Sequence, residues 1–402
     1  MPAPLDFFLE ALPRRFSPGK AGDWRATLHL DTGEGEGYTL AIESGSCRIE
    51  RGRHGEPTAV ITGKREVWER LAEGCDTFKN AFVRGDLRTT QSTALLRFEK
   101  CFDLTKDLLE ESESGERPGL RRELVGQTVR GEPVRAELAR VRAFAEATGD
   151  DCPAYLDPEG GIVPPVFPIT FMRPIFVKLL TEQETGGDVQ QMVHSKQDMR
   201  FLAPIRPGDM VEPSGRVEGV TEEALGDTLT IEQELRASGE VAVEMTTTLF
   251  FRAPTGSRRR TGGKRLMTRP HSTGRSKAVL FEERVEVKAE MPLLYAEASG
   301  DLNPIHTDRD FARSAGFRDV LLQGTCTMAL AGRSIVKACA GNDPRRLARL
   351  KVRFARPVFP GDTLTTIGWV EKEEDGQRAL GFEVANQDGK RVLIDGLAVV
   401  RE

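Results

Sequence analysis

The stretch VLLQGTCTMALAGRSIVKACA, residues 320–340, is long, largely apolar and interrupted by glycine, which favours a buried helix. A strand-like segment, AVLFEERVEV (278–287), and a helical segment, PLLYAEASG (292–300), precede it. Because strand-like segments with alternating apolar residues also follow, we expect one long helix wrapped by an antiparallel sheet. The segments that follow are RLKVRFARPV (349–358), TLTTIGWVEKEE (363–374), RALGFEVANQ (378–387) and KRVLIDGLAVV (390–400).

A second copy of this unit lies earlier in the chain. FAEATGDDCPAYLD (144–157) matches YAEASGDLNPIHTD (295–308) at seven of fourteen positions, and FLAPIRPGD (201–209) matches FARPVFPGD (354–362) at five of nine. The two offsets, 151 and 153 residues, are nearly equal. They therefore indicate an internal duplication of a unit of about 130 residues. A long helix embraced by an antiparallel sheet is the hotdog arrangement, and its duplication predicts a double hotdog.

Two polar stretches divide the chain into three predicted domains. ESESGERPGLRRE (111–123) is charged and interrupted by Gly and Pro, and residues 253–277 contain eight Lys or Arg residues and no acid. The second stretch reads as a solvated linker or as a basic strip that meets phosphates. The expected domains are residues 1–108, 120–255 and 276–402.

The first domain has a different pattern, with four short strand-like segments followed by helical ones, which predicts a small α+β domain. Its strand meander, the Thr-Gly turn at 62–63, the AFVRGDL stretch (81–87) and the closing amphipathic segment resemble the sterol-carrier-protein family. That resemblance implies a lipid-binding domain with an apolar interior. The alternative is an unrelated α+β module for dimerisation or solubility. The fold class of the whole chain is therefore α+β.

The composition excludes some classes of protein. The 402 residues have a net charge of −5 and an isoelectric point near 5.8, which argues against a general nucleic-acid-binding protein. No apolar run reaches the length of a membrane span, and neither a signal-peptide layout at the start nor a peroxisomal address at the end is seen. We expect a cytoplasmic protein with reduced thiols, because no two cysteines form a Cys-x-x-Cys pair. The six cysteines are Cys47, Cys75, Cys101, Cys152, Cys326 and Cys339.

The segment SGDLNPIH (299–306) carries the residues that could do chemistry. Gly-Asp and Asn-Pro are ordinary turn signals, so a surface turn is one reading. The other reading is a proton-transfer pair, in which Pro304 stiffens the loop so that Asp301 and His306 converge. Asn303 could bind backbone groups or orient the carboxylate. A metal site with Asp308 lacks a second histidine or a cysteine ligand nearby, so we predict no metal.

YAEASGDLNPIHTD resembles the signature of MaoC-like proteins and (R)-specific enoyl-CoA hydratases, with a small residue, Ala312, six positions after the histidine. The resemblance extends over residues 120–402. It implies that Asp301 and His306 hold one water between them, and that the backbone N–H of Gly324 stabilises the thioester oxygen. It implies no cofactor. The family usually has histidine before that glycine, whereas this chain has Gln323, which cannot titrate.

The first repeat lacks the complete motif. Asp150 keeps the aspartate, but Cys152 replaces the asparagine and Tyr155 replaces the histidine. His194 does not restore the motif, and we expect it to have a structural or substrate-lining role. In two-repeat hydratases a degenerate half is thought to make room for bulky acyl chains, and the Pro- and Gly-rich run 160–171 fits such a loosened segment.

The predicted function is that of an (R)-specific 2-enoyl-CoA hydratase, or 3-hydroxyacyl-CoA dehydratase in reverse, acting on fatty acyl thioesters with a fused lipid-carrier domain. A 3-hydroxyacyl-ACP dehydratase is the rival among enzymes, and a non-catalytic acyl-CoA or lipid-binding protein is the rival from another class. A thioesterase is less compatible with the Gly-Asp-x-Asn-Pro-x-His loop. The expected partners are the acyl thioester, a lipid in the first domain and, as an option, a second copy of the chain.

Overall fold

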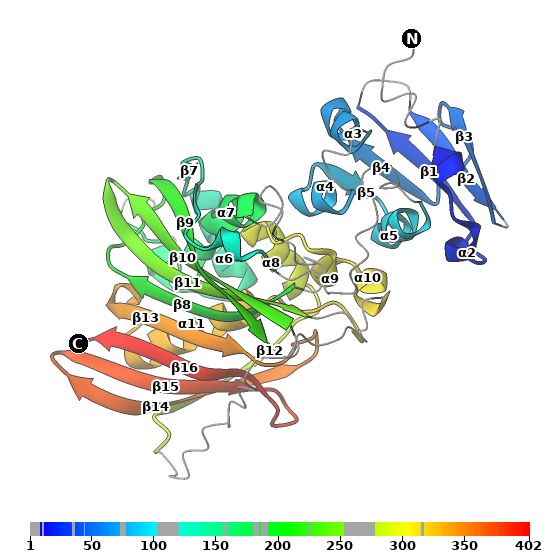
Figure 1. Ribbon diagram of the computed structural model, residues 1–402. Helices are drawn as coiled ribbons and strands as arrows, with labels where there is room; N and C mark the ends of the chain where they lie inside the picture. Colours follow the sequence, from blue (N-terminus) through cyan, green and yellow to red (C-terminus); the bar gives the residue numbers. More distant parts are fainter. Residues whose placement is uncertain are drawn as a thin grey trace. The chain divides into compact units, whose positions relative to one another are not determined.

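The computed structural model (Figure 1) divides the chain into two compact units. The first unit comprises Met1–Gly115 and Asp308–Gly316, and the second comprises Glu116–Thr307 and Phe317–Glu402. The structure describes residues 9, 12–33, 37–43, 45–72, 78–102, 120–155, 157, 160–179, 185, 192–223, 226–252, 278–314 and 317–402. The basic stretch 253–277 lies outside the described residues.

The first unit contains a five-stranded sheet in the order β3-β2-β1-β4-β5. The first three strands form an antiparallel meander, and β4 pairs with β1 in parallel. Leu28, Leu30, Leu40 and Ile42 are buried on this sheet, as their apolar character predicts. The strands are β1 (Ala26–Asp31), β2 (Tyr38–Glu43), β3 (Ser46–Arg51), β4 (Ala59–Gly63) and β5 (Leu87–Thr89).

Aromatic side chains fill the core of the first unit. Trp68 contacts Phe78, which contacts Phe98, which stacks on Phe102, with ring centroids 5.7, 5.1 and 4.6 Å apart. The short helix α10, which follows the Asp-x-Asn-Pro-x-His loop in sequence, contacts α5 within this unit. The helices are η1 (Leu12–Arg15), α2 (Pro18–Ala21), α3 (Arg65–Ala72), α4 (Phe78–Arg84), α5 (Ser92–Cys101) and α10 (Arg309–Ser314).

The second unit contains one 11-stranded sheet that runs through both repeats. Its order is β12-β14-β15-β16-β13-β8-β11-β10-β9-β6, with β7 paired to β9. The repeats meet where β13 pairs antiparallel with β8, and there Arg349 donates two hydrogen bonds of 2.9 and 2.6 Å to Asp198. The duplicated sequence therefore forms a pseudo-dimer within a single chain.

The described residues of the first repeat form short helices and six strands. Its helices are η2 (Arg122–Leu124), α6 (Leu138–Ala147), η3 (Pro153–Tyr155), η4 (Phe167–Met172) and α7 (Arg173–Val177). Its strands are β6 (Thr128–Arg130), β7 (Val134–Arg135), β8 (Met192–Phe201), β9 (Met210–Glu223), β10 (Gly226–Ala237) and β11 (Glu240–Arg252).

The second repeat has the long buried helix predicted for it. Helix α11 (Gly324–Cys339) contacts β12, β13, β14 and β16. Gly332 permits close packing, because a Cβ at that position would lie 3.1 Å from a methyl carbon of Leu350. The other elements are α8 (Met291–Ser299), α9 (Pro304–Thr307), η7 (Pro344–Arg346), β12 (Phe281–Glu286), β13 (Leu347–Phe354), β14 (Thr363–Glu374), β15 (Gln377–Ala385) and β16 (Arg391–Arg401).

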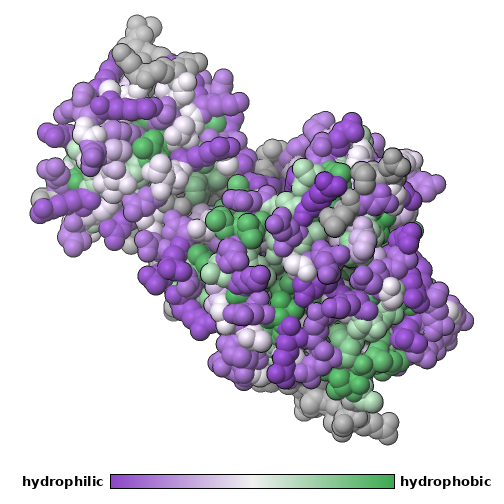
Figure 2. All heavy atoms as spheres, turned by 180° about the vertical axis from the view of Figure 1, so that it is seen from behind, coloured by the Kyte–Doolittle hydropathy of each residue, from purple (hydrophilic) through white to green (hydrophobic). Residues whose placement is uncertain are grey.

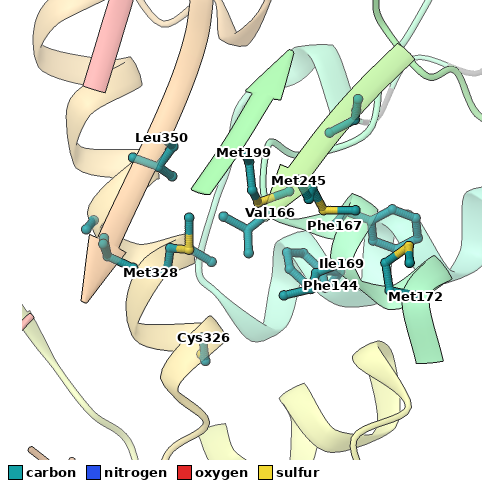
Figure 3. Packing of buried hydrophobic residues seen from close by; sticks show 14 of the residues in the cluster. Phe144, Val166, Phe167, Ile169, Met172, Met199, Met245, Cys326, Met328 and Leu350 are labelled. Atoms are coloured by element: carbon teal, nitrogen blue, oxygen red, sulfur yellow. The ribbon is translucent and has the colours of Figure 1, made fainter. Parts of the chain in front are cut away.

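The first repeat differs from the second where the long helix would lie. The described part of this segment, residues 160–179, forms the short elements η4 and α7, and η4 contacts β9 and β10. Apolar side chains of η4 and of the sheet pack together there (Figure 3). The two repeats thus share the sheet architecture of a double hotdog, but within the described residues only the second has a sixteen-residue central helix.

Two arginines, which we call the arginine clasp, link the repeats at the ends of their first helices. Arg333 on α11 donates hydrogen bonds of 2.8 Å to the carbonyls of Thr148 and Gly149, just after α6. Arg173 on α7 donates to the carbonyl of Gly300, just after α8. Positive charge at a helix C-terminus is favourable because the carbonyls there carry unbalanced partial negative charge.

The helices α6 and α8 pack against each other between the clasp residues. Phe144 and Tyr295, which occupy equivalent positions in the two repeats, contact each other with ring centroids 5.1 Å apart. Each helix ends at a glycine with positive φ, Gly149 at 60° and Gly300 at 80°. Glycine adopts this conformation without the steric cost that a Cβ would bring.

Among the helices in the described ranges, none has both the length and the apolar character needed to cross a membrane. Hydrophilic side chains cover much of the face shown in Figure 2, with scattered apolar patches. Large exposed apolar side chains of the second unit include Val279, Leu280, Leu293, Leu294 and Leu302.

The substitution Arg333→Leu removes one side of the arginine clasp. We expect it to lower the free energy of unfolding of the second unit by about 1.5–3 kcal/mol, because hydrogen bonds from a charged donor contribute in that range. Differential scanning calorimetry measures the change. Arg284→Ala removes an exposed pair with Glu282 and serves as the control, with an expected loss below about 1 kcal/mol. Equal melting temperatures for the two variants would contradict the role of the clasp.

Candidate active site

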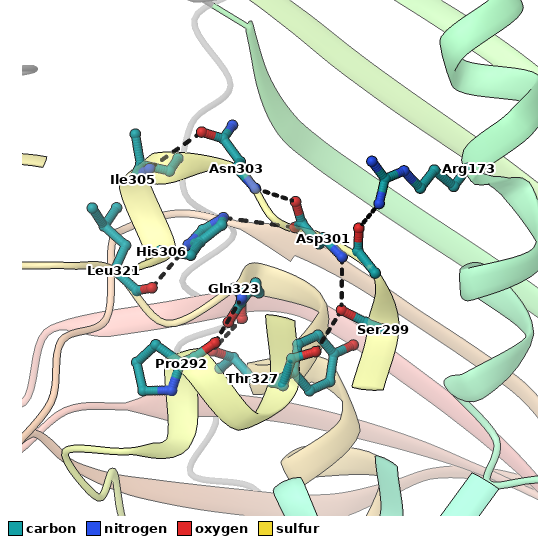
Figure 4. A network of polar contacts seen from close by, with 12 residues as sticks. Arg173, Pro292, Ser299, Asp301, Asn303, Ile305, His306, Leu321, Gln323 and Thr327 are labelled. Atoms are coloured by element: carbon teal, nitrogen blue, oxygen red, sulfur yellow. Dashed lines mark hydrogen bonds and ion pairs between the residues drawn. The ribbon is translucent and has the colours of Figure 1, made fainter. Parts of the chain in front are cut away.

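The loop between α8 and α9 brings the predicted motif residues together (Figure 4). After Gly300 ends α8, the backbone N–H of Asp301 donates to Ser299 Oγ at 3.2 Å, and that hydroxyl donates to the Tyr295 carbonyl at 2.6 Å. The side chain of Asp301 is 47% exposed. The carboxylate therefore lies at the surface of the unit, and the hydrogen bonds with Ser299 and Tyr295 fix the backbone that carries it.

Asn303 organises the turn rather than pointing at the carboxylate. Its Oδ1 accepts a hydrogen bond of 3.2 Å from the N–H of Ile305, and its own N–H donates to Asp301 Oδ1 at 3.5 Å. Pro304 occupies the first position of α9, where a missing N–H costs nothing. The structure places Asn303 as the residue that starts α9 and thereby sets the position of His306.

His306 is 9% exposed and faces Asp301. Its Nδ1 lies 2.8 Å from the carbonyl of Leu321, and its Nε2 lies 3.7 Å from Asp301 Oδ2. A carbonyl only accepts hydrogen bonds, so Nδ1 carries a proton, and in the neutral imidazole Nε2 is left with a lone pair. Two acceptors 3.7 Å apart do not hydrogen-bond directly, but one water molecule can donate to both.

Gly324 lies at the start of α11, where the first backbone N–H groups of a helix have no partner inside it. The positive end of the helix dipole favours an oxygen that gains negative charge at this place. A Cβ at position 324 would lie 3.0–3.4 Å from the ring of Phe354. The packing therefore favours glycine at the first residue of the helix.

Gln323 connects the start of α11 to the start of α8. It is 1% exposed, and its Nε2 donates a hydrogen bond of 3.0 Å to the carbonyl of Pro292. Its Oε1 has no partner among the described residues. The glutamine that replaces the expected histidine thus has a positioning role and leaves the Asp301–His306 pair in place.

The sequence motif does not predict that arginines of the first repeat hold the helix end from which the Asp301 loop starts. Arg173 and Arg140 both donate to the C-terminal end of α8, at the carbonyls of Gly300 and Ala298. Burial lowers the pKa of Arg140, and the nearby charge of Arg173 lowers it further. The only signal in the sequence is a single arginine inside the apolar run PVFPITFMRPIFV (165–177).

The equivalent loop of the first repeat keeps its turn but not its chemistry. The N–H of Cys152 donates to Asp150 Oδ1 at 3.3 Å, as Asn303 does to Asp301. Tyr155 is fully buried, and burial raises its pKa well above the usual value. Burial also raises the pKa of Asp150. This loop has no imidazole, and the carboxylate of Asp150, the counterpart of Asp301, is partly buried.

His194 comes from β8 of the first repeat and lies beside the site. Its ring contacts that of Phe354, with centroids 4.8 Å apart. Burial lowers the pKa of His194 to about 4, while the charge of Asp301 acts in the opposite direction. In the described part of the chain, no group of three or more His, Cys, Asp or Glu residues could hold a metal ion.

Comparison with known families matches both repeats. The profile of the family described as MaoC like domain matches residues 272–389, and the profile of the FAS1-like, dehydratase domain region matches residues 123–245. These two matches cover the second and the first repeat, respectively.

Individual proteins give the same assignment. The chain is 32% identical over 221 residues to 3-hydroxyacyl-thioester dehydratase Y of Mycobacterium tuberculosis, covering 52% of this chain and 72% of that protein. It is 30% identical to the peroxisomal enoyl-CoA hydratase 2 of Arabidopsis thaliana, covering 51% of this chain and 67% of that protein. A solved MaoC-like dehydratase from Phytophthora capsici has a TM-score of 0.58 at 21% identity, over 69% of this chain and 96% of that one, which shows the shared fold.

Proposed function

Because the chain belongs to the MaoC-like dehydratase family, we propose that it is an (R)-specific 2-enoyl-CoA hydratase that also catalyses the reverse reaction, dehydration of a 3-hydroxyacyl-CoA. The observation that carries the proposal is the pair formed by Asp301 and His306, whose oxygen and Nε2 face each other across 3.7 Å. That separation suits a water molecule that donates a hydrogen bond to each group.

Hydration adds the hydroxyl group of water to the β-carbon and a proton to the α-carbon. The catalytic pair must therefore accept one proton and return one. His306 Nε2 has the lone pair that can accept one proton from water as the hydroxyl adds to the β-carbon, and Asp301 holds the second hydrogen of the same water. The protonated imidazole then returns its proton to the α-carbon, so the C=C π bond is replaced by one C–O and one C–H bond. In the transition state negative charge develops on the thioester oxygen, which the backbone N–H of Gly324 can stabilise.

The relatives' names favour coenzyme A as the thiol carrier over an acyl carrier protein, since one of them is an enoyl-CoA hydratase. A non-catalytic binding protein is disfavoured, because Gln323 contacts Pro292 and leaves the catalytic pair unchanged. A thioesterase is disfavoured, because the loop places two hydrogen-bond acceptors, Asp301 and His306, around one water molecule instead of presenting a nucleophilic side chain. A homodimer and a cytoplasmic location stay predictions from the sequence.

The substitutions Asp301→Asn and His306→Ala test the proposed reaction. Each should lower kcat by about 10²–10⁴-fold while the affinity for a 3-hydroxyacyl-CoA product stays within a few-fold. Because both groups act on one water, the double variant should be scarcely slower than the slower single variant. The loss of enoyl-thioester absorbance with crotonyl-CoA and decenoyl-CoA measures the rates.

Tyr155→Phe in the first repeat is the matched control, since it removes one hydroxyl from the equivalent loop position and should leave kcat nearly unchanged. Near-normal kcat in both Asp301→Asn and His306→Ala would show that the loop is only a surface turn.

We further propose that the first unit binds the hydrophobic acyl group of the substrate or a lipid. The support is its resemblance to sterol carrier proteins together with an α+β architecture whose apolar side chains are gathered inside a sheet covered by helices. Such a unit could hold acyl substrates near the enzyme that uses them.

Deletion of residues 1–108 tests the carrier proposal. Titration of the full chain and of the shortened chain with a fluorescent fatty acid should show that the deletion removes one acyl-binding site. Hydration of crotonyl-CoA is the control, because it should persist if the second unit stays folded. The same number of fatty-acid sites in both proteins would contradict a carrier function.

A further inference from the structure

A row of hydrogen-bonded polar side chains crosses the interior face of the first repeat. We call His194, Gln197, Thr247 and Gln233 the polar strip. His194 Nε2 lies 3.0 Å from Gln197 Oε1, and Thr247 Oγ1 lies 2.8 Å from that oxygen and 2.9 Å from Gln233 Oε1. Gln197 and Thr247 are fully buried, and Gln233 is 3% exposed.

The strand register identifies the counterparts of the polar strip in the second repeat. Gln197 lies opposite Thr247 where β8 pairs with β11. The corresponding positions on β13 and β16 are Leu350 and Ala398. All four counterparts are apolar and buried around α11, and in the order of the strip they are Leu347, Leu350, Ala398 and Phe382. The strip therefore replaces an apolar interior in one repeat only.

One polar atom of the strip has no hydrogen-bond partner within the strip. The hydroxyl of Thr247 has one proton, so it can donate to one glutamine and must accept from the other. One side-chain polar atom of Gln233 then has no partner among the described residues. An unpaired buried polar atom is unfavourable, and a ligand oxygen that hydrogen-bonds to it would remove this penalty.

The strip leads away from the reacting centre. Phe354 lies against the position of Gly324, and His194 also contacts Phe354. From Phe354 on β13 the strip crosses the neighbouring strands β8, β11 and β10 in turn. Three strand spacings amount to roughly 14 Å, a length comparable with that of an extended acyl tail.

The interior of the second repeat is filled by α11, whereas the described part of the first repeat has only the short elements η4 and α7 at the corresponding place. There Met199 and Met245 lie beside Val166 and Phe167, with Met328 on α11 across from them (Figure 3). Methionine side chains are flexible and adapt to irregular apolar shapes. The interior of the first repeat thus has flexible apolar side chains on one side and the polar strip on the other.

We propose that the polar strip recognises an oxygen function, a hydroxyl or a carbonyl, on the acyl tail, and that Gln233 and Thr247 determine the specificity for oxygenated enoyl thioesters. The inference rests on the proposed hydratase function. A site built to hydrogen-bond an oxygen discriminates against the analogue that lacks it, because the buried polar groups are then left unpaired.

The test compares decenoyl-CoA with ω-hydroxydecenoyl-CoA and with decenoyl-CoA derivatives that carry the hydroxyl nearer to the thioester. For at least one hydroxylated substrate we expect a kcat/KM about tenfold higher than for the plain one. Gln233→Leu and Thr247→Val should each remove most of this preference without abolishing hydration of decenoyl-CoA. Gln127→Leu, a glutamine change in the same repeat outside the strip, should keep the preference.

A binding measurement separates this inference from the proposed reaction. Decanoyl-CoA and its hydroxylated analogues cannot be hydrated, and the strip predicts that the wild-type chain binds a hydroxylated analogue about tenfold more tightly. Thr247→Val removes a single oxygen and is the conservative variant if Gln233→Leu fails to fold. Equal affinities and equal kcat/KM values across the series would overturn the strip inference while decenoyl-CoA hydration continued. Loss of hydration with a retained binding preference would overturn only the proposed reaction.

Discussion

The arginine clasp between the repeats is the interaction on which the active site depends. Arg173 of the first repeat holds the carbonyl of Gly300, one residue before Asp301, and Arg333 holds the matching carbonyl in the other direction. Asp301 is partly exposed, so its own side chain contributes little to the rigidity of the loop. The position of the loop is therefore fixed by contacts within the second repeat and by the arginines of the first repeat that bind the end of α8.

Duplication has let the two repeats diverge in different directions. The second repeat has α11, which fills its interior, and the pair Asp301 and His306, to which we assign the proposed reaction. The first repeat keeps the turn at Asp150 but buries Tyr155 in place of the histidine. Without a long helix in its described part, its sheet presents polar and adaptable side chains inward. In the proposed account, the second repeat carries the reaction centre, and the first repeat supports it and recognises the acyl tail.

Much of this architecture could be predicted from local sequence patterns. The apolar run 320–340, the alternating strands and the duplication gave the double hotdog, and the Gly-Asp-x-Asn-Pro-x-His spacing gave the loop that joins Asp301 to His306. The support by Arg173 and the contact of Gln323 with Pro292 could not be predicted, since each depends on which residues meet across the interface of two helices. The polar strip was hidden for a similar reason, because only the strand register brings Gln197, Thr247 and Gln233 together.

The central claim is that each chain has one reaction centre, built by the second repeat and supported by the first. Calorimetric titration of the full chain with 3-hydroxybutyryl-CoA, a short product with little apolar surface for the first unit to hold, measures the number of sites most directly. The account predicts one site per chain, selective for the (R) isomer. Two equivalent sites per chain would contradict it, because the loop with Asp150 and Tyr155 would then also form a working centre.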